Sequence, residues 1–412
     1  MIAEEYSNVI EVKETGLDFS PMHAAVQAYI DQGVIPFANS VVMQGTEVVD
    51  LHFYGDSALE SGRPLAADSI FRMHSSTKIA CSIALMQMWE KGQFKLSDAL
   101  SDYIPAFADM QVLQSGATSI DATEPAKDDI RISQILSHTS GLSYGFIEPE
   151  GTIDSAYNQA GINPFLPDST MTLESLCDML GQLPLAYQPG TFWRYSFATD
   201  VCARLVEVLS GQRFDDYLKA NIFEPLGMVD TDFYVPEEKL DRLTTMFAPE
   251  DPMDPMSPCP IPMDTSSNTT DNKLPLFLSG GGGLLSTLAD YLAFSRMIMS
   301  GGSWNGQRII STETLDLMRV DQCPDGVGVN FPMWSMPGTG FGLGFALKGQ
   351  PADGEPQSAV GEFHWGGMAG THFWWSPSAD IAGICMTQRM PGFWHPFSQV
   401  FKKHAYQIAA QR

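Results

Sequence analysis

The sequence predicts an α/β protein of the α+β type, in which both ends of the chain form one sheet and the middle is mainly helical. Strand-like runs bounded by turn residues occur near both ends of the chain. The expected strands are Ala38–Met43, Glu47–Tyr54, Phe363–Trp365, Thr371–Trp375 and Ile381–Gln388, with a turn at Pro377–Asp380 before the last one. Strands at both ends with helices between them favour one sheet interrupted by a helical insertion.

Apolar periodicity and boundary residues predict the helices. After Ser75 an apolar stripe ends before Gly92, which indicates an amphipathic helix; the stripe consists of Ile79, Ile83, Met86 and Trp89. The pattern then stays mainly helical to about Phe247. Further helices are expected at Met22–Gln32, at Asp200–Ser210, from Thr287–Asp290 onward and at Phe397–Ala409.

One segment reads as irregular. Between Pro249 and Pro262 six prolines alternate with Met and Asp, which excludes regular structure and predicts a long loop. A lid function for this loop is a hypothesis that rests on composition alone.

The composition is that of a globular, enzyme-sized protein, with 412 residues, 44% hydrophobic and 17% charged. A chain of this length can bury a large core. Asp and Glu number 49 against 23 Lys and Arg, so the formal net charge is −26. An acidic surface repels phosphate backbones, which argues against nucleic acid as the main partner and favours a small-molecule substrate.

No stretch of the sequence predicts export or a membrane span. The first thirteen residues carry three glutamates and lack the basic start and apolar run of a secretory signal. Ile79–Trp89, the longest apolar-leaning stretch, is too short to cross a bilayer. The six scattered cysteines, without a CxxC pair, are expected to be reduced and mostly buried. We therefore expect a cytoplasmic protein without membrane contact, and the sequence leaves open whether it is a homo-oligomer.

The strongest local signal for chemistry is Ser75-Ser76-Thr77-Lys78. Positions three apart share a helix face, so the Ser75 hydroxyl and the Lys78 amine can meet. A serine needs a neighbouring base to become a nucleophile, and a lysine can serve when burial lowers its pKa. The alternative is that Ser75 only caps a helix, since short Ser-x-x-Lys runs often occur by chance.

Two further stretches carry chemical groups. Tyr195, on the loop 189–197 before a helix, can share a proton with a nearby lysine and serine. In His364–Thr371 the glycines allow close approach of a ligand, and such a strand edge can supply an N–H to an oxyanion hole. The alternatives are a half-buried aromatic at Tyr195 and a glycine-rich turn with Trp365 in the core.

The order and spacing of these stretches resemble the serine β-lactamase and penicillin-binding-protein superfamily, and in particular the class C β-lactamase-like esterases called family VIII carboxylesterases. The similarity covers nearly the whole chain. Its supporting stretches are Phe71–Lys78 (FRMHSSTK), Leu136–Leu142 (LSHTSGL), Trp193–Ser196 (WRYS), Gly281–Thr287 (GGGLLST) and Trp365–Gly367 (WGG).

The resemblance implies a β-lactamase-like fold, with a central antiparallel sheet flanked by helices and the active site at its junction with the helical region. Residues 1–70 and 271–412 would form the sheet domain, and residues 71–270 the mainly helical region. Ser75 matches the acylated nucleophile, Lys78 the lysine that assists its deprotonation, and Tyr195 the tyrosine that relays the proton to the leaving group. The N–H groups of Ser75 and Met368 match the oxyanion hole.

Departures from the motifs of class C β-lactamases favour an ester over a β-lactam as the substrate. Trp365-Gly366-Gly367 stands where class C β-lactamases carry Lys-Thr-Gly, so the cationic anchor of that motif is missing. Phe197 replaces the asparagine of Tyr-x-Asn and offers an aromatic ring instead of an amide. An aromatic pocket lined by Trp365, Gly366, Gly367 and Phe197 would suit a neutral, short- to medium-chain or aromatic ester.

Three alternatives stay open. The first is a β-lactamase, D-amino-acid amidase or peptidase, and the second is an acyltransferase with the same acyl-enzyme. The third is a non-catalytic binding module on this fold. Gly141-x-Ser143-x-Gly145 fits a nucleophile elbow but lacks the strand before it, so we interpret it as a chance match. No cofactor and no metal are expected, because no His or Cys cluster has ligand spacing.

Overall fold

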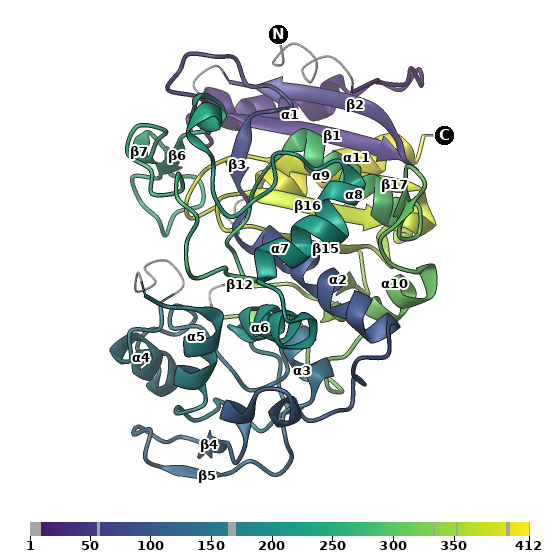
Figure 1. The fold of residues 1–412 in the computed structure, drawn as a ribbon. Coiled ribbons are helices and arrows are strands. Elements are labelled where there is room, and N and C mark those ends of the chain that lie inside the picture. Colours follow the sequence, from purple (N-terminus) through teal and green to yellow (C-terminus); the bar gives the residue numbers. More distant parts are fainter. Residues whose placement is uncertain are drawn as a thin grey trace.

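The computed structural model describes residues 10–55, 58–163, 170–332, 334–351, 353–392 and 396–411. Its centre is a seven-stranded antiparallel sheet with the order β13-β14-β15-β16-β17-β1-β2 (Figure 1). The strands are β1 (Ala38–Gln44), β2 (Glu47–Tyr54), β13 (Thr339–Phe341), β14 (Ala346–Lys348), β15 (Phe363–Gly366), β16 (Thr371–Ser376) and β17 (Ile381–Met386). Val41 of β1 lies opposite Ile384 of β17, so the two ends of the chain share one sheet, as predicted.

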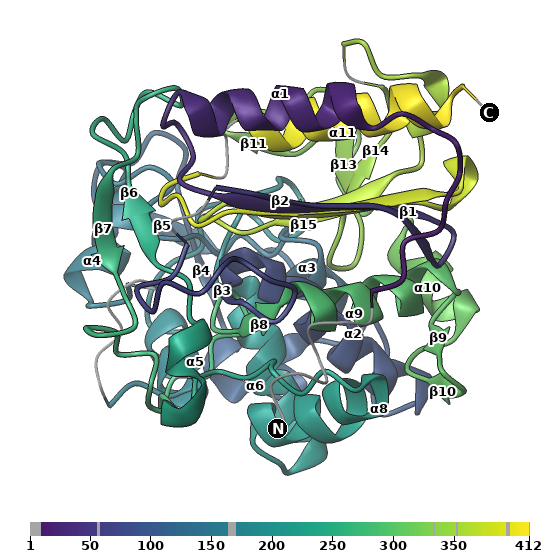
Figure 2. The same cartoon turned by 90° about the horizontal axis from the view of Figure 1, so that it is seen from above.

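Helices cover both faces of this sheet (Figure 2). Side chains alternate between the faces along each strand, because successive residues point in opposite directions. In β1, Val42 packs with Trp374 and Cys385 under two terminal helices, whereas Val41 belongs to the larger core on the other face. The terminal helices are α1 (Ser20–Asp31) and α11 (Phe397–Ala409), and the other face carries α9 (Leu288–Met299) and α2 (Thr77–Glu90).

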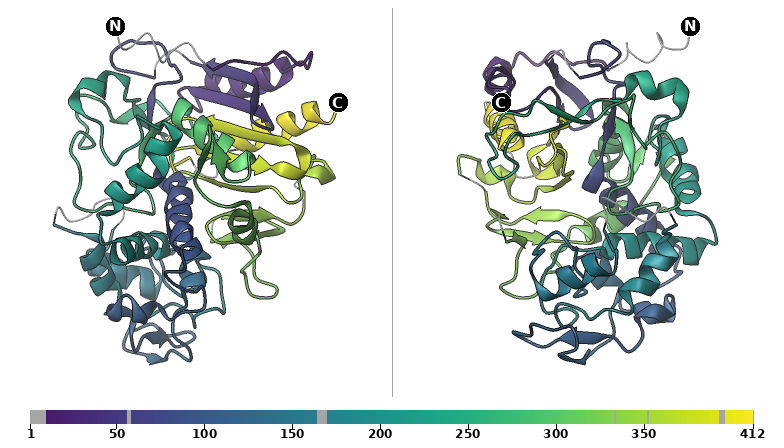
Figure 3. Two further views of the ribbon diagram at one scale, coloured as in Figure 1. Left: turned by 45° about the vertical axis from the view of Figure 1, so that its right-hand side comes forward. Right: turned by 90° about the vertical axis from the view of Figure 1, so that its left-hand side faces the viewer.

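Apart from α10, the middle of the chain supplies the remaining helices, and most of them lie below the sheet in the first view of Figure 3. The helix α2 runs between this part and the sheet and packs against two of its helices, α6 and α7. All residues from Thr77 to Met88 are therefore buried, and the expectation of an amphipathic helix is wrong: α2 is enclosed on every side. The helices are α3 (Ile132–Leu136), α4 (Thr152–Gln159), α5 (Leu173–Leu180), α6 (Ala198–Ser210), α7 (Phe214–Leu218), α8 (Glu224–Leu226) and α10 (Thr312–Met318).

Short two-stranded ladders also occur outside the central sheet, and the sequence analysis did not predict their strands. They are β3 (Ile70–Arg72) with β8 (Leu285–Thr287), β4 (Gln111–Leu113) with β5 (Thr123–Pro125), β6 (Met246–Ala248) with β7 (Ile261–Asp264), β9 (Ser303–Trp304) with β10 (Gln307–Arg308), and β11 (Asn330–Phe331) with β12 (Trp334–Ser335). The prediction that Pro249–Pro262 excludes regular structure is wrong at its end, because β7 contains Ile261 and Pro262. A two-stranded ladder tolerates proline, since an edge strand does not need every N–H.

Short turns of other helix types connect these elements. They are η1 (His74–Ser76), η2 (Leu100–Asp102), η3 (Pro105–Phe107), η4 (Lys219–Phe223), η5 (Glu237–Arg242), η6 (Gln357–Ala359) and η7 (Pro377–Ala379). The start of α9 is as predicted: the Thr287 side chain accepts a hydrogen bond from the Asp290 N–H at 3.2 Å. The six cysteines are unpaired and five of them are buried, which confirms that prediction. Across the described residues, no helix has both the length and the apolar character that crossing a bilayer requires. The division into residues 1–70 with 271–412 and residues 71–270 stays a proposal.

Candidate active site

Ser75 lies in η1, the tight turn that joins β3 to α2. His74 directly before it has a φ of +44°, a left-handed conformation that costs a non-glycine residue on the order of 1–3 kcal/mol. Tertiary contacts hold the turn: Thr77 Oγ1 accepts from the Leu284 N–H at 3.1 Å. The α2 N-cap is Ser76, and its side chain makes no capping bond. The alternative that Ser75 serves as the helix cap is therefore excluded.

Lys78 is buried beneath Ser75 and is held by three oxygen atoms. Its Nζ donates to the Gly281 carbonyl at 2.6 Å, to the Tyr144 hydroxyl at 3.1 Å and to Ser75 Oγ at 3.4 Å. Burial lowers the pKa of Lys78 to about 7, against an opposing effect of the Asp200 carboxylate. Near neutral pH a large fraction of Lys78 is therefore the free amine, which can accept a proton from Ser75.

Tyr195 lies over the lysine, on the loop that leads into α6. Lys78 Nζ is 4.5 Å from the centre of the Tyr195 ring, and Trp365 Nε1 donates to the Tyr195 hydroxyl at 3.2 Å. Burial raises the pKa of Tyr195, and hydrogen bonds from Ser75 and Trp365 only partly oppose this. The hydroxyl keeps its proton at neutral pH and is placed to donate it.

The sequence analysis missed Tyr144 and Asp200. Tyr144 contacts the Lys78 amine, and its hydroxyl donates to Asp200 Oδ2 at 3.4 Å. Asp200 Oδ1 accepts from the Gly281 N–H at 3.0 Å, so the carboxylate positions the glycine residue whose carbonyl holds Lys78. A Cβ on Gly281 would come within 2.6 Å of both Asp200 and Tyr144, so only glycine fits there.

Tyr144 lies two residues beyond the LSHTSGL stretch, inside the run interpreted as a chance nucleophile elbow. The interpretation of Ser143 itself agrees with the structure, because its hydroxyl donates to Asp154 and accepts from Arg194 Nε at 2.6 Å in a buried network. A tyrosine next to a recognised motif was the available signal for Tyr144. No sequence feature marks Asp200 as a site residue, and its role becomes visible only in the folded structure.

His138, from the LSHTSGL stretch, supports the Tyr195 loop. Its carbonyl accepts from the Arg194 N–H at 2.8 Å, and its Nδ1 lies 3.1 Å from Ser196 Oγ. The ring packs against Tyr195 with 4.9 Å between centroids. Burial lowers the pKa of His138 well below its usual range, so the ring is neutral and positions its neighbours without charge.

The end of β15 approaches the nucleophile turn closely. A Cβ on Gly367 would meet the Met73 carbonyl oxygen at 2.2 Å, so glycine is required for the two segments to touch. Gly367 donates its N–H to the Thr371 carbonyl at 2.6 Å, whereas the N–H of Met368 makes no hydrogen bond within the described residues. Met368 lines the same cavity as Ser75.

A cavity of about 500 Å³ opens beside Ser75. Its apolar walls include Phe146, Phe233, Leu274, Leu276 and Phe277, and its polar lining includes Arg72, His74, Asp271 and Lys273. Phe146 and Phe233 come from the part of the chain between β3 and β8, and 274–277 add a contiguous apolar stretch to the lining. A larger hollow of about 700 Å³ lies along β13 and β14, but Ser75, Lys78 and Tyr195 are not among its described lining residues.

The residues predicted to contact the substrate are mostly not part of the described lining of this cavity. Within the described residues, its lining includes Met368 but none of the four predicted contacts Trp365, Gly366, Gly367 and Phe197. Trp365 instead holds the Tyr195 hydroxyl, and the Phe197 ring packs 4.5 Å from Tyr144. The aromatic ring at position 197 therefore supports the site from behind, and direct contact with substrate stays a prediction for these four residues.

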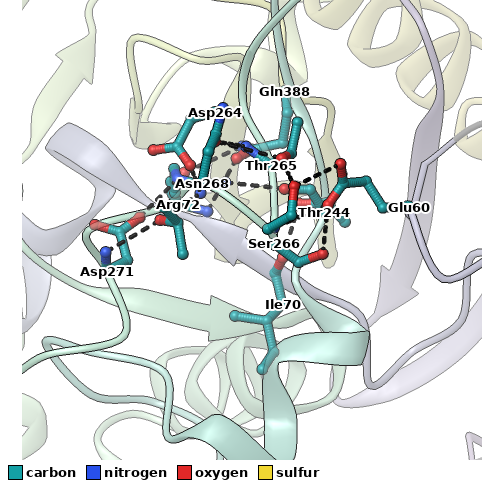
Figure 4. A network of polar contacts seen from close by, with 12 residues as sticks. Glu60, Ile70, Arg72, Thr244, Asp264, Thr265, Ser266, Asn268, Asp271 and Gln388 are labelled. Carbon is teal, nitrogen blue, oxygen red and sulfur yellow. Dashed lines mark hydrogen bonds and ion pairs between the residues drawn. The ribbon is translucent and has the colours of Figure 1, made fainter.

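A buried arginine fixes the outer wall (Figure 4). Arg72, three residues before Ser75, donates through Nε to Asp271 at 2.7 Å and through Nη2 to Asp264 at 2.6 Å. Its Nη1 donates to the Thr244 carbonyl at 2.9 Å. These charge-assisted bonds join β3, which leads into the nucleophile turn, to the segment that forms the cavity wall. Within the described part of the chain, no group of His, Cys, Asp and Glu side chains is arranged to hold a metal ion.

Comparisons with known proteins agree with this geometry. The Beta-lactamase family matches residues 22–398 of the chain. Protein Rv1367c of Mycobacterium tuberculosis (strain ATCC 25618 / H37Rv) is 32% identical over 381 residues, which cover 89% of this chain and 89% of that protein.

Two further proteins carry activities in their names. Esterase EstB of Burkholderia gladioli is 28% identical over 371 residues, covering 87% of this chain and 88% of EstB. The solved structure of EstCE1, described as a hydrolase with promiscuous acyltransferase activity, superposes with a TM-score of 0.77 at 24% identity. That match covers 94% of this chain and 98% of EstCE1, and it shows that the two share a fold.

Proposed function

Because the chain belongs to the Beta-lactamase family, we propose that it hydrolyses carboxylic esters through an acyl-enzyme on Ser75. The observation that carries the proposal is the buried Lys78 amine, 3.4 Å from Ser75 Oγ, with a pKa lowered to about 7. The name of EstB, which shares 28% identity over most of both chains, supports an ester as the substrate.

In the acylation step, Ser75 Oγ attacks the ester carbonyl carbon while neutral Lys78 accepts the serine proton. The bond to the alcohol oxygen then breaks, and Tyr195 gives its hydroxyl proton to the leaving alkoxide. The Lys78 ammonium returns a proton to Tyr195. The products are an alcohol and an acyl-Ser75 enzyme, with no net change in protons.

In the deacylation step, water attacks the acyl carbonyl and gives one proton to the same base. The bond to Ser75 Oγ breaks, the serine recovers a proton, and the carboxylic acid leaves. In both steps the carbonyl oxygen gains negative charge. The unpaired Met368 N–H, with that of Ser75, is the proposed oxyanion hole, and losing one such donor typically costs about 10²–10³ in rate.

A second candidate is acyl transfer to an alcohol, and the printed description of EstCE1 favours keeping it. The acyl-enzyme is the same, and only the acceptor differs. Product analysis with an added alcohol such as butanol separates the two, since transfer yields a butyl ester at the expense of free acid.

The test of the proposal is turnover of p-nitrophenyl butyrate, followed by intact-mass spectrometry of the enzyme. Ser75→Ala should lower the rate by at least about 10³-fold and abolish the butyryl adduct. The matched control is Ser143→Ala, at the serine of the chance nucleophile elbow, which should still form the adduct on Ser75. An adduct that survives Ser75→Ala, or that depends on Ser143, would overturn the assignment. Faster turnover of a cephalosporin than of the ester would instead favour the β-lactamase alternative.

A further inference from the structure

The cavity beside Ser75 contains one cation that no carboxylate neutralises. Three side chains that carry charge at neutral pH line it, namely Arg72, Asp271 and Lys273. Arg72 and Asp271 are paired at 2.7 Å, and Arg72 also binds Asp264. Within the described residues Lys273 makes no ion pair or hydrogen bond, although Asp271 is only two positions away. Because Asp271 is paired with Arg72, the carboxylate nearest to Lys273 in sequence does not pair with Lys273.

The positive charge of Lys273 is opposite in sign to the net charge of the whole protein. The protein carries a formal net charge of −26, so a negatively charged ligand is repelled at long range. At physiological salt such repulsion is screened beyond about 8 Å, and contacts inside the cavity then decide which ligand binds. Lys273 is solvent-exposed and also lines the cavity, so it favours an anion at the cavity entrance.

The surroundings of Lys273 are apolar. The residues after it, Leu274 and Leu276, line the cavity and are 39% and 63% exposed. Phe277 continues the wall inward, where it is buried. A ligand that covers these side chains and also reaches Lys273 combines an apolar body with an anionic group.

A second polar group in the cavity also lacks a partner. The Nε2 atom of His74, the residue before the nucleophile, is shielded from solvent and makes no hydrogen bond within the described residues. A buried polar atom without a partner costs about 1–3 kcal/mol. His74 lines the cavity together with Ser75 and Lys273.

We propose that the natural ester carries a carboxylate apart from the scissile bond and that Lys273 binds this carboxylate. The proposal rests on the ester hydrolysis proposed above and names its substrate class as amphiphilic, anionic esters. It also revises the expectation of a neutral substrate. That expectation followed from the predicted aromatic pocket, the missing lysine of the Lys-Thr-Gly motif and the net charge of −26. The structure supplies a cation from a different segment.

The test uses two pairs of esters that differ only in charge. In 4-acetoxybenzoate and 4-acetoxybenzamide the charge difference lies on the leaving phenol. In mono-p-nitrophenyl glutarate and p-nitrophenyl 4-carbamoylbutyrate it lies on the acyl group. For each pair the measured quantity is the ratio of kcat/KM for the anionic ester to that for the neutral one.

Lys273→Glu should lower this ratio about tenfold in at least one pair, because it replaces attraction by repulsion, and Lys273→Met should have a smaller effect. The matched control is Lys127→Glu, an exposed lysine outside the cavity that gives the same net charge. It should leave the ratio unchanged.

Binding to the Ser75→Ala variant, measured by calorimetry, separates this proposal from the proposed function. The anionic ester of the affected pair should bind this variant more tightly than its neutral partner, and Lys273→Glu should remove the difference. A ratio and a binding difference that do not respond to Lys273→Glu would overturn the carboxylate site. If the Ser75→Ala variant keeps the wild-type turnover and the binding difference persists, only the proposed mechanism is overturned.

Discussion

Two lysines lie on opposite faces of the central sheet, the buried Lys78 and the partly buried Lys402, and their pKa values shift in opposite directions. Lys78 on α2 contacts neutral oxygens, and burial lowers its pKa to about 7. Lys402 on α11 lies 2.7 Å from the fully buried Glu362 carboxylate, and its pKa is raised although burial acts in the opposite direction. The pKa of Glu362 is correspondingly lowered, because the attraction of Lys402 and its hydrogen bonds outweigh burial.

The comparison shows that burial alone does not create a base. What differs between these two lysines is a carboxylate in direct contact with the Lys402 amine. Contact alone does not keep a pKa high, because Lys348 pairs with Glu355 and its pKa is still lowered by burial and by the nearby charge of Lys402. Asp200, the carboxylate nearest to Lys78 in this network, acts through the Gly281 peptide and Tyr144 instead of touching the amine. A lysine arranged in this way can lose its proton near neutral pH, whereas Lys402 is fixed as an ammonium ion.

The two sites also affect stability with opposite signs. The folded pKa of Lys78 is below its ordinary value of 10.5, so its burial destabilises the fold fully below about pH 7. This penalty disappears as the pH rises towards 10.5. Glu362 has a lowered pKa, so its contribution is favourable at neutral pH and is lost in acid.

The largest expected effect comes from Lys78→Met. It removes the proposed base and should lower kcat/KM for p-nitrophenyl butyrate about 10²–10⁴-fold at pH 7. The fold should persist at pH 7, since the change also removes a buried charge. Activity is measured as initial rate and folding by circular dichroism. A well-folded variant that keeps a tenth of the rate would remove Lys78 from the mechanism.

For Lys402→Met we expect a loss of stability with little change in activity. It leaves Glu362 buried without its closest cation, although Lys348 approaches at 3.7 Å and the Tyr406 hydroxyl donates at 2.8 Å. Breaking a buried pair in this way costs about 3 kcal/mol. The urea midpoint should therefore fall at pH 7, while kcat/KM at 25 °C stays within about twofold, because the network faces away from Ser75. A large loss of rate without loss of stability would contradict the division between the two lysines.

Much of this architecture could be predicted from the sequence. The β2 and α11 boundaries were predicted to the residue, because strand alternation and helix periodicity are local signals. The burial of α2 on all sides was not predicted, since it depends on which helices pack around it. The Ser-x-x-Lys spacing placed Ser75 beside Lys78, because one helical turn fixes both.

The groups that tune the site come from segments far apart in the chain. Asp200 reaches Lys78 through Gly281, 81 positions later in the sequence. The apolar wall and Lys273 belong to an irregular segment whose position depends on the Arg72 ion pairs. No periodicity marks such residues. The packing of Phe197 against Tyr144 likewise depends on tertiary contacts that the sequence does not predict.

The smallest expected effect is the most specific test of the comparison. Asp200→Asn keeps a side-chain acceptor for the Gly281 N–H but removes the negative charge that raises the pKa of Lys78. The acidic limb of the kcat/KM profile, expected near pH 7 in the wild type, should therefore move down by up to about one pH unit. The matched control is Asp290→Asn. Burial raises the pKa of that carboxyl to about 6, so it also titrates near this limb, but it contacts Thr231 and not the active site. If the limb follows Asp290, or does not move with Asp200, then a group other than Lys78 governs the acidic limb, and the contrast between Lys78 and Lys402 does not explain catalysis.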